Sequence, residues 1–269
     1  MAKWAGYVSQ KMKIEVGALA QYSVLLDHKE YALNQYLGLN IRLEHNGESR
    51  CIGCGSKKVY EDGFCFPCVR SRPETDICQV RPELCHFEAK TCRDEEFAKK
   101  RCFIPHVVYL SLSSHLKVGI TREMNVPSRF LDQGAVQALP IARVQDRISS
   151  GSLEVRLKER YSDKTSWQKM LKAEVEFRDL TIVRQEALEY LNEAGLTFEA
   201  LNGPILSFDY PSIKKPEKIK SVSPKKLGVV EGELWGMRGQ YLILSTGVVQ
   251  MRNLVGHHLE VTVAEAADF

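Results

Sequence analysis

The sequence has no run of about 18 apolar residues, which is the length that a membrane-spanning helix needs. Its first residues, Met-Ala-Lys-Trp-Ala-Gly-Tyr, also lack the charged and then apolar pattern of a signal peptide. We therefore expect a soluble, cytoplasmic protein with no membrane partner. At 44% hydrophobic and 26% charged residues, the chain has a globular rather than a disordered or fibrous composition. The net charge of +3 is too small to indicate a partner by itself.

Cysteine is absent from most of the chain, because all eight cysteines lie between Cys51 and Cys102. Structural disulfides are not expected in a reducing compartment, so this clustering predicts metal binding. The first cysteine set forms two C-x2-C turns that are separated by ten residues. Two such turns bring four thiolates to one tetrahedral zinc ion. The members of this set are Cys51, Cys54, Cys65 and Cys68.

The second cysteine set has wider spacings and contains no C-x2-C turn. A second zinc site is one interpretation, with His86 or His106 as a substitute for one cysteine ligand, and an iron–sulfur cluster is the other. Four protein ligands leave no open coordination position for water, so we expect both centres to be structural. The members of the second set are Cys78, Cys85, Cys92 and Cys102.

The two ends of the chain resemble each other. Residues 20–44 and 239–263 each begin near Gln-Tyr, place a glycine about sixteen residues later and end in alternating apolar and polar residues. Such alternation is typical of half-buried antiparallel strands. Chance similarity between two hairpins is the alternative. We expect residues 1–45 and 227–269 to be β-meanders that pair into one small β-domain.

Between the two ends we expect a cysteine-rich zinc module (46–105), an α/β domain (106–202) and a linker (203–226), which together give an α+β fold. Residues 107–112 and 116–121 have the β-branched content of two strands of a hairpin. Helices are expected near 127–133, over 153–161 and over 175–192. Six lysines between Lys214 and Lys226 indicate a solvated linker or, alternatively, a segment that contacts phosphates.

The order of motifs in the α/β domain resembles that of the GIY-YIG nuclease superfamily. The motifs are V-Y-L at 108–110, K-V-G-I-T-R at 117–122, R-F-L at 129–131 and L-E at 153–154. In that superfamily a hairpin carries the two name motifs, an arginine follows on the next helix and a glutamate on a later one. The wider combination is similar to a family of uncharacterised bacterial cysteine-rich zinc proteins, in which D-Q-G-A (132–135) and D-K-T-x-W (163–167) follow the hairpin.

The resemblance implies a role for each matching residue. Tyr109 takes the place of the first motif's tyrosine, Gly119 that of the second motif's glycine, Arg129 that of the arginine and Glu154 that of the metal-binding glutamate. Lys117 stands where the second motif has tyrosine, and a valine replaces the first motif's glycine. We expect the Lys117 ammonium to lower the pKa of the Tyr109 phenol, and Mg²⁺ to bind at Glu154.

Structural roles are the alternative for each of these residues. Tyr109 would be a half-buried strand aromatic, Lys117 a solvent-facing residue, and Glu154 a helix-surface acid paired with Lys158. Polar residues around the motifs are candidates for contact with nucleic acid, with Trp167 as a stacking surface. Helix capping and core packing are the alternatives for this group, whose members are Arg122, Gln133, Lys164 and Trp167.

Three functions are therefore open. The first is a metal-dependent phosphodiesterase of the endonuclease type that acts on DNA or RNA. The second is a non-catalytic, zinc-containing protein that binds nucleic acid and has a vestigial GIY-YIG site. The third is a zinc-based scaffold for protein interactions.

Overall fold

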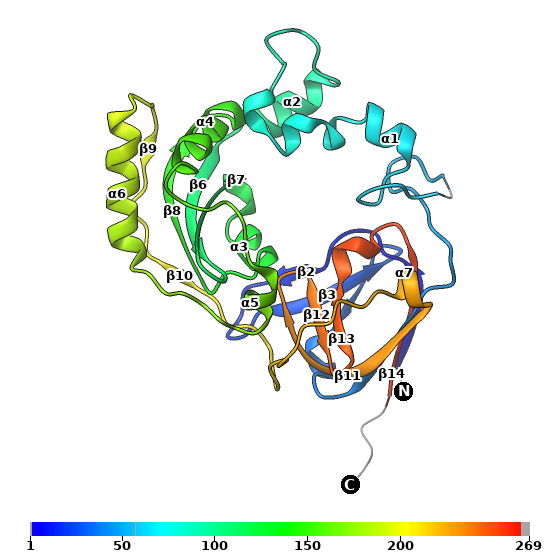
Figure 1. The fold of residues 1–269 in the computed structure, drawn as a ribbon. Helices are drawn as coiled ribbons and strands as arrows, with labels where there is room; N and C mark the ends of the chain where they lie inside the picture. The colour runs from blue at the N-terminus through cyan, green and yellow to red at the C-terminus, as the bar shows by residue number, and fades with distance from the viewer. Residues whose placement is uncertain (1, 57, 265–269) are drawn as a thin grey trace. The chain divides into compact units, whose positions relative to one another are not determined.

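The computed structural model describes residues 2–56 and 58–264. The chain divides into two compact units, which we describe separately. Unit 1 contains residues 1–69, 171–173 and 209–269, and unit 2 contains residues 70–170 and 174–208. Several sheets and helices give a mixed α+β fold (Figure 1). No helix in the described part of the chain has both the length and the apolar character needed to span a bilayer.

Unit 1 is built on a six-stranded sheet that combines the two ends of the chain. The strand order is β1-β14-β5-β11-β12-β13, and β1 pairs antiparallel with β14. Ile41 and Leu43 of β5, and Leu259 and Val261 of β14, are buried and alternate with more exposed residues. One face of the sheet is therefore a core face, as the alternation in the sequence predicts. The bounds are β1 Ala2–Tyr7, β5 Asn40–Glu44, β11 Val229–Arg238, β12 Tyr241–Leu244, β13 Gly247–Gln250 and β14 His258–Val263.

A second, three-stranded sheet in unit 1 has the order β2-β3-β4. Its central strand buries Tyr22, Val24 and Leu26. The bounds in this part of unit 1 are β2 Lys13–Glu15, β3 Gln21–Leu26 and β4 Lys29–Ala32, with short 3-10 helices at Asn34–Tyr36 and Met251–Leu254.

The lysine segment, residues 214–226, is held against unit 1 at both ends. Just before it, the Ile213 N–H donates to the Trp235 carbonyl of β11 at 2.8 Å. Near its end, the Val222 N–H donates to the Val248 carbonyl of β13 at 3.0 Å, and helix α7 (Pro224–Leu227) follows. The backbone of the segment is thus bonded to the sheet near both of its ends, which its lysine and proline content did not reveal.

The sheet of unit 2 has the order β10-β8-β6-β7, and β9 pairs with β8. Strands β6 and β7 form the expected hairpin around Ser113-Ser114-His115, and every residue of β6 is buried. A strand that is buried on both faces needs cover on both sides, and buried residues of α4 and α6 join one core with β6, β7 and β8. The bounds are β6 His106–Leu112, β7 Leu116–Arg122, β8 Gln137–Val144, β9 Glu199–Ala200 and β10 Leu206–Ser207.

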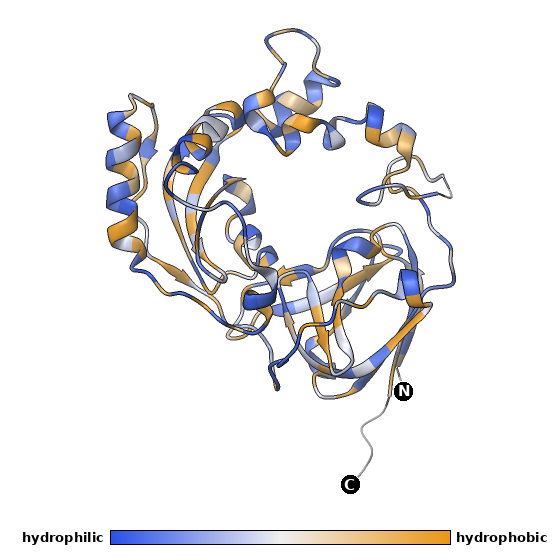
Figure 2. Cartoon of the chain, viewed as in Figure 1, coloured by the Kyte–Doolittle hydropathy of each residue, from blue (hydrophilic) through white to orange (hydrophobic). Residues whose placement is uncertain are grey.

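The helices of unit 2 begin where acidic side chains cap them. Helix α4 (Arg147–Leu157) starts six residues before the expected Leu153, because the Asp146 carboxylate accepts the Ser149 N–H at 2.7 Å. Helix α6 (Leu180–Glu193) starts at Leu180 rather than Val175, because Asp179 caps it in the same way. Figure 2 shows hydrophobic and hydrophilic residues on different sides of α6. The other helices are α3 Ser128–Asp132, α5 Trp167–Leu171 and a 3-10 turn at Glu123–Asn125.

The cysteine-rich part of the chain contains short elements only. Helix α1 (Phe66–Ser71) contains Cys68, the last residue of the first cysteine set, which lies in unit 1. Helix α2 (Glu95–Arg101) lies between Cys92 and Cys102 of the second set, in unit 2. Three 3-10 turns connect them, at η2 Pro73–Thr75, η3 Ile77–Gln79 and η4 Pro82–Leu84. Elements this short are weakly stable alone and depend on cross-links or packing.

Gly119 provides a test of how tightly the hairpin is packed. A Cβ atom at Gly119 would lie 2.6 Å from the Tyr109 hydroxyl oxygen and 2.7 Å from its Cζ. Tyr109 is fully buried and its ring contacts Phe130, with ring centroids 4.7 Å apart, so the ring has little room to move. We expect Gly119→Ala to lower the free energy of unfolding by about 1–3 kcal/mol, measured by urea denaturation.

Gly203→Ala is the matched control in the same unit, because a Cβ atom there meets no atom within 4 Å. Equal stability of the two variants would contradict the tight packing of Gly119 against Tyr109.

Candidate functional site

The first cysteine set gathers its four sulfur atoms within 4.8 Å of one another. Backbone N–H groups point at these sulfurs: the Cys65 N–H donates to the Cys51 Sγ at 3.2 Å, and the Gly53 N–H donates to it at 3.4 Å. Gly55 adopts a φ of +76° in the first turn, a conformation that glycine accepts readily. The four side chains therefore lie close enough to hold one metal ion.

The ionisation of these thiols supports a metal thiolate site. Hydrogen bonds from Ser56 lower the pKa of Cys54 to about 6. Burial raises the pKa of Cys68 to about 12, and the neighbouring thiols raise it further. Four thiolates so close together repel one another unless a cation lies among them. The donor set is thus suited to zinc, whose structural sites use four such ligands.

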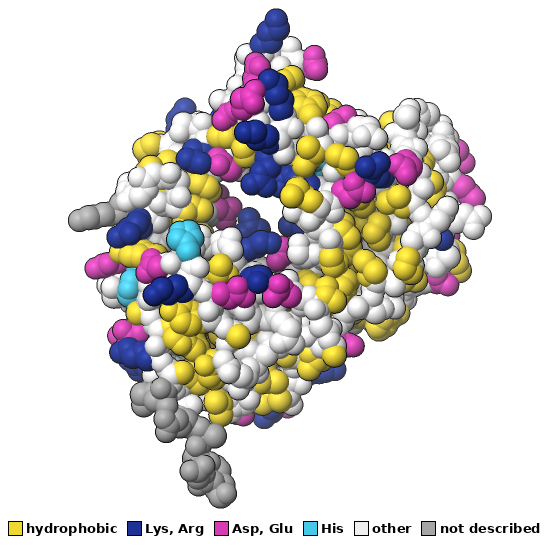
Figure 3. Space-filling view, turned by 180° about the vertical axis from the view of Figure 1, so that it is seen from behind, with side chains coloured by type: hydrophobic (Ala, Val, Ile, Leu, Met, Phe, Trp, Pro, Cys, Tyr) yellow, Lys and Arg dark blue, Asp and Glu magenta, His cyan; other side chains and the backbone are white. Residues whose placement is uncertain are grey.

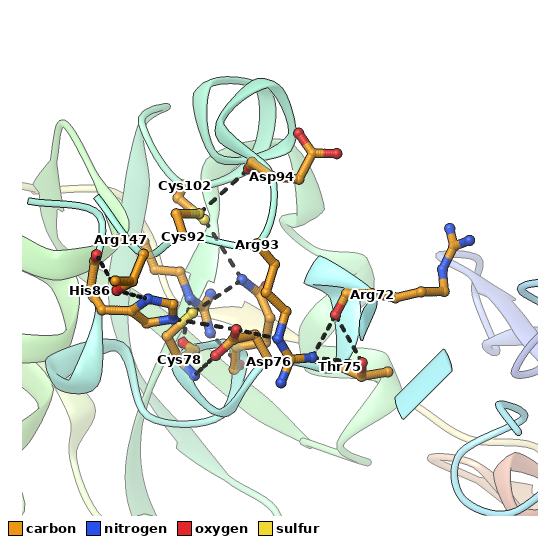
Figure 4. A network of polar contacts seen from close by, with 12 residues as sticks. Arg72, Thr75, Asp76, Cys78, His86, Cys92, Arg93, Asp94, Cys102 and Arg147 are labelled. Atoms are coloured by element: carbon orange, nitrogen blue, oxygen red, sulfur yellow. Dashed lines mark hydrogen bonds and ion pairs between the residues drawn. The ribbon is translucent and has the colours of Figure 1, made fainter. Parts of the chain in front are cut away.

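The second cysteine set lines a single small pocket with Asp76 and Arg93, whose surroundings are drawn in Figure 4. Cys78 and Cys102 are buried. In the described part of unit 2, the potential ligand atoms that lie within 4.8 Å of one another belong to Asp76, Cys78 and His86 rather than to four cysteines. The sequence contains no motif that singles out Asp76, so sequence reasoning missed it.

Asp76 is already held by several hydrogen-bond donors. Its Oδ2 forms an ion pair with Arg93 Nε at 2.8 Å and contacts His86 Nε2 at 3.3 Å, and its Oδ1 accepts the Cys78 N–H at 3.3 Å. Burial opposes ionisation, but these donors hold the pKa of Asp76 below its ordinary value. His86 also contacts Thr91, with 2.9 Å between Nδ1 and Oγ1. Asp76 therefore orients its neighbours as a carboxylate.

His106, the other histidine considered as a ligand, is fully buried in β6. Its Nδ1 lies 2.7 Å from the Ile104 carbonyl oxygen. Burial lowers the pKa of His106 to about 4, so the ring is neutral at physiological pH. It does not belong to either group of close ligand atoms among the described residues.

Tyr109 of β6 projects toward α3. Its hydroxyl donates to Gln133 Oε1 at 2.8 Å, and the Arg129 guanidinium interacts with it by charge and hydrogen bonding. Burial nevertheless raises the pKa of Tyr109 above its ordinary value. The expectation that the Lys117 ammonium lowers this pKa is therefore wrong: the positive charge that acts on Tyr109 is that of Arg129, and burial outweighs it.

Lys117 and Glu154 bring opposite charges to the same region. The Lys117 side chain is buried, at 5% exposure, rather than solvent-facing, and burial together with Arg129 lowers its pKa to about 8. Glu154 and Asp163 oppose this shift, so both carboxylates lie within electrostatic range of Lys117. Burial also raises the pKa of Glu154. We call Tyr109, Lys117, Arg129 and Glu154 the hairpin site, because Arg129 and Glu154 each interact electrostatically with both Tyr109 and Lys117.

The Glu154 carboxylate has a partner on its own helix. It lies 3.4 Å from Lys158 Nζ, and Lys158 also contacts Asp163 at 3.2 Å. The pairing that the sequence suggested as a structural role for Glu154 is therefore present. The Glu154 side chain is only 13% exposed, which is unusual for an acid whose sole role is a helix-surface ion pair.

The residues considered for contact with nucleic acid fall in different places. Gln133 belongs to the hairpin site through Tyr109. Arg122 instead contacts α2, where its Nε donates to the Arg101 carbonyl at 2.9 Å. Lys164 is exposed in the loop after α4, and Trp167 is half-buried at the start of α5.

The fold and these sites define a mixed α+β protein with a four-cysteine cluster that is suited to metal. A family profile described as "Protein of unknown function (DUF2797)" matches residues 38–259, which is more than half of the chain, so the chain belongs to this family. Searches of curated proteins and of solved structures give no match.

Lys117 allows a test of whether burying its ammonium group lowers the free energy of unfolding. Its pKa is lowered from 10.5 to about 8 because burial disfavours the ammonium. We expect Lys117→Met, which keeps the length and removes the charge, to raise the free energy of unfolding at pH 7 by about 1–3 kcal/mol. The gain should shrink as pH rises from 8 to above 10.5, because the lysine then folds and unfolds as a neutral amine.

The measurement is urea denaturation at pH 7 and at pH 10.5, with the exposed Lys164→Met as control. A Lys117→Met protein less stable than the control at pH 7 would show that the ammonium stabilises the fold.

Proposed function

We propose that this protein is a metal-dependent phosphodiesterase that cleaves DNA or RNA. The observation that carries this function is the hairpin site, in which the Arg129 guanidinium and the Glu154 carboxylate each interact electrostatically with the Tyr109 phenol and with the Lys117 amine. Ionisable groups with shifted pKa values that are held together out of water are typical of active sites.

Each group has a role in breaking a phosphodiester bond. The Arg129 guanidinium would neutralise charge on the phosphate as water attacks phosphorus and the bond to the leaving oxygen breaks. Lys117, with a pKa near 8, has a neutral fraction at physiological pH that can accept the proton of the attacking water. The neutral Tyr109 hydroxyl, held by Gln133, would position that water.

Glu154 would hold a magnesium ion together with water. The fit rests on the paired acids: Lys158 Nζ lies 3.4 Å from Glu154 and 3.2 Å from Asp163, so this pair of carboxylates already accommodates a positive charge. Magnesium needs only one or two carboxylates and keeps several waters. When bound there, the ion would supply charge stabilisation at the leaving oxygen.

The metals at the cysteines would have structural roles. We propose that the first cysteine set binds zinc with four thiolates and no open position, and that the second set binds a further metal ion. The proposed catalytic groups are those of the hairpin site rather than those of either cysteine set.

Nucleic acid is the proposed partner because of the lysine segment. Its six lysines are all exposed, whereas its one acidic residue is Glu217. Four of them line a pocket beside Trp235, and Lys214 Nζ lies 4.5 Å from the Trp235 ring centroid. Because the segment is bonded to the sheet near both ends, less backbone entropy is lost when its lysines contact phosphates than for a free linker. The four are Lys214, Lys215, Lys218 and Lys220.

A non-catalytic protein that binds nucleic acid is the second candidate function. The Glu154–Lys158 ion pair favours it, because that pair satisfies the carboxylate without a metal ion. This function needs the lysine segment and does not need Glu154.

Glu154→Gln distinguishes the two candidates. We expect it to reduce Mg²⁺-dependent cleavage of labelled single- and double-stranded DNA and RNA by roughly 100-fold or more, the range typical for loss of one electrostatic contact to a transition state. Glu189→Gln, an exposed acid of α6, is the control and should leave cleavage unchanged. Equal cleavage by both variants, or no cleavage by the wild type, would remove the catalytic role.

The lysine segment is tested by binding rather than by cleavage. We expect Lys215→Ala/Lys218→Ala to weaken binding of a fluorescent oligonucleotide and to lower the slope of log Kd against log salt by about 2, one for each lost phosphate contact. Lys29→Ala/Lys58→Ala, a pair of exposed lysines elsewhere in unit 1, is the control with the same charge change. Fluorescence anisotropy at several salt concentrations measures both, and equal slopes would show that the lysine segment is not the contact surface.

A further inference from the structure

The four sulfurs of the second cysteine set come from separate short elements and face one pocket. Cys78 lies in η3, Cys85 follows η4, Cys92 precedes α2 and Cys102 is the C-cap of α2. All four are free of disulfides. Cys85 interacts electrostatically with Cys78, Cys92 and Cys102, although no three of these sulfurs lie within 4.8 Å of one another. Gln79 Nε2 also lies 3.9 Å from the Cys78 sulfur and 3.7 Å from the Cys102 sulfur.

The segment around this pocket has little apolar core of its own. Among the described residues 72–105, the buried apolar side chains besides Pro82 are Cys78, Ala98 and Cys102. Two of these three are cysteines that line the pocket. A segment with so few apolar contacts needs another source of stability, and metal ligation is one that cysteines supply.

Two arginines place positive charge beside the same sulfurs. Arg147 interacts electrostatically with Cys102 and Cys78, and Arg122 interacts with Cys102. In the described part of the chain neither arginine forms an ion pair with a carboxylate. Arg147 donates to the carbonyls of Cys78 and Gln79, and Arg122 donates to a carbonyl of α2.

Figure 3 shows further Lys and Arg side chains over α2 and the loop before it, at the top of the view, with Asp and Glu side chains among them. Arg101 and Arg147 both lower the pKa of Arg122, because these like charges repel one another. Four thiolates around a divalent ion carry more negative charge than the ion neutralises, and they would therefore provide the counter-charge for these groups.

Asp76 and His86 are weaker candidates as ligands at this pocket. Asp76 is engaged by Arg93 at 2.8 Å, and both groups are mostly buried, so a metal bound by Asp76 would have to break this ion pair. Through its bond to the Cys78 N–H, the carboxylate instead fixes the turn that presents the Cys78 sulfur (Figure 4). We regard Asp76 as a positioning residue for that sulfur.

We propose that Cys78, Cys85, Cys92 and Cys102 bind a second zinc ion and that Arg147 connects this centre to helix α4. Four cysteine side chains that line one pocket are the ligand set of a structural zinc site. Arg147 is the first residue of α4, and Glu154 lies two turns further along the same helix. The effect on Glu154 rests on the proposed function, whereas the zinc centre itself does not.

Helix α4 also packs directly on the turn between two of the ligands. A Cβ atom at Gly151 would lie 2.6 Å from the Pro82 Cβ, so α4 and η4 approach as closely as a glycine allows. Cys78 precedes η4 and Cys85 follows it. An ion that fixes both cysteines thus fixes the surface on which α4 lies.

Metal content of the purified full-length chain tests the zinc centre, measured by inductively coupled plasma mass spectrometry. We expect two zinc ions per chain in the wild type, one in Cys85→Ser/Cys92→Ser and one in Cys54→Ser/Cys65→Ser. One zinc per chain in the wild type, with no loss in Cys85→Ser/Cys92→Ser, would overturn the second centre. Iron and acid-labile sulfide in place of the second zinc would equally overturn it.

If the cysteine variants fail to fold, the number of metal sites can still be measured in the wild type, which is refolded with Co²⁺. Absorption of Co²⁺–thiolate bands should saturate at two equivalents per chain, and saturation at one equivalent would contradict two centres. These readouts do not depend on cleavage, so they stand even if Glu154→Gln shows that the protein is not a nuclease.

The connection through Arg147 is tested with Arg147→Met, which removes the guanidinium. We expect this variant to lose zinc from the second centre to a chelator roughly 10- to 100-fold faster than the wild type does. Loss of a side chain that supports a metal ligand typically weakens metal binding by such a factor. Zinc at the first set should be unchanged. Arg143→Met is the control, because Arg143 pairs with Glu123 and Glu199 instead. Equal zinc release from Arg147→Met and Arg143→Met would overturn the role of Arg147.

Discussion

Four cysteine thiolates held within 4.8 Å of one another need a cation, and this constraint governs the cysteine-rich part of the chain. Backbone N–H groups lower the pKa of Cys51 despite its burial, whereas Cys68 resists ionisation. Without a metal ion the cluster holds a mixture of charged and neutral sulfurs. With one, all four become equivalent ligands and the surrounding loops gain the cross-link that their few apolar residues do not provide.

The hairpin site places a different kind of constraint on unit 2. The fold buries Lys117 of β7 and Glu154 of α4, two groups that favour water, beside a β6 strand whose residues are all apolar or neutral. Burying them lowers stability, and an apolar residue at Lys117 would pack more favourably. Such a destabilising arrangement is expected where side chains serve chemistry or binding rather than the core.

The sequence predicted those elements whose formation depends on residues close together along the chain. Apolar residues at every second position, Ile41 and Leu43 in one segment and Leu259 and Val261 in the other, predicted strands with one buried face. The β-branched residues of the hairpin predicted β6 and β7. The two C-x2-C turns predicted the cluster at the first cysteine set. These features follow from spacing along the chain, so a single sequence is enough to find them.

Features that depend on distant contacts were not predictable in the same way. A lysine- and proline-rich segment has the same composition whether it is solvated or bonded to β11 and β13 through Ile213 and Val222. Asp76 belongs to no sequence motif, and its ion pair is with Arg93, which lies seventeen residues away along the chain. The burial of Lys117 depends on α3, α4 and the loop at Ser162 that pairs with its strand. Tertiary structure decides each of these outcomes.

The proposed function accounts for Lys117, which stands where the GIY-YIG motifs that the sequence resembles have tyrosine. A phenol buried as deeply as that of Tyr109 has a raised pKa and holds its proton at physiological pH, so a second buried tyrosine would be a poor proton acceptor. The same burial acts in the opposite direction on an amine, and it brings the pKa of Lys117 to about 8. Replacing tyrosine by lysine in a dry site therefore moves the titrating group toward physiological pH, where a general base is most effective. Burial, which argues against Tyr109 as the base, thus favours Lys117 in that role.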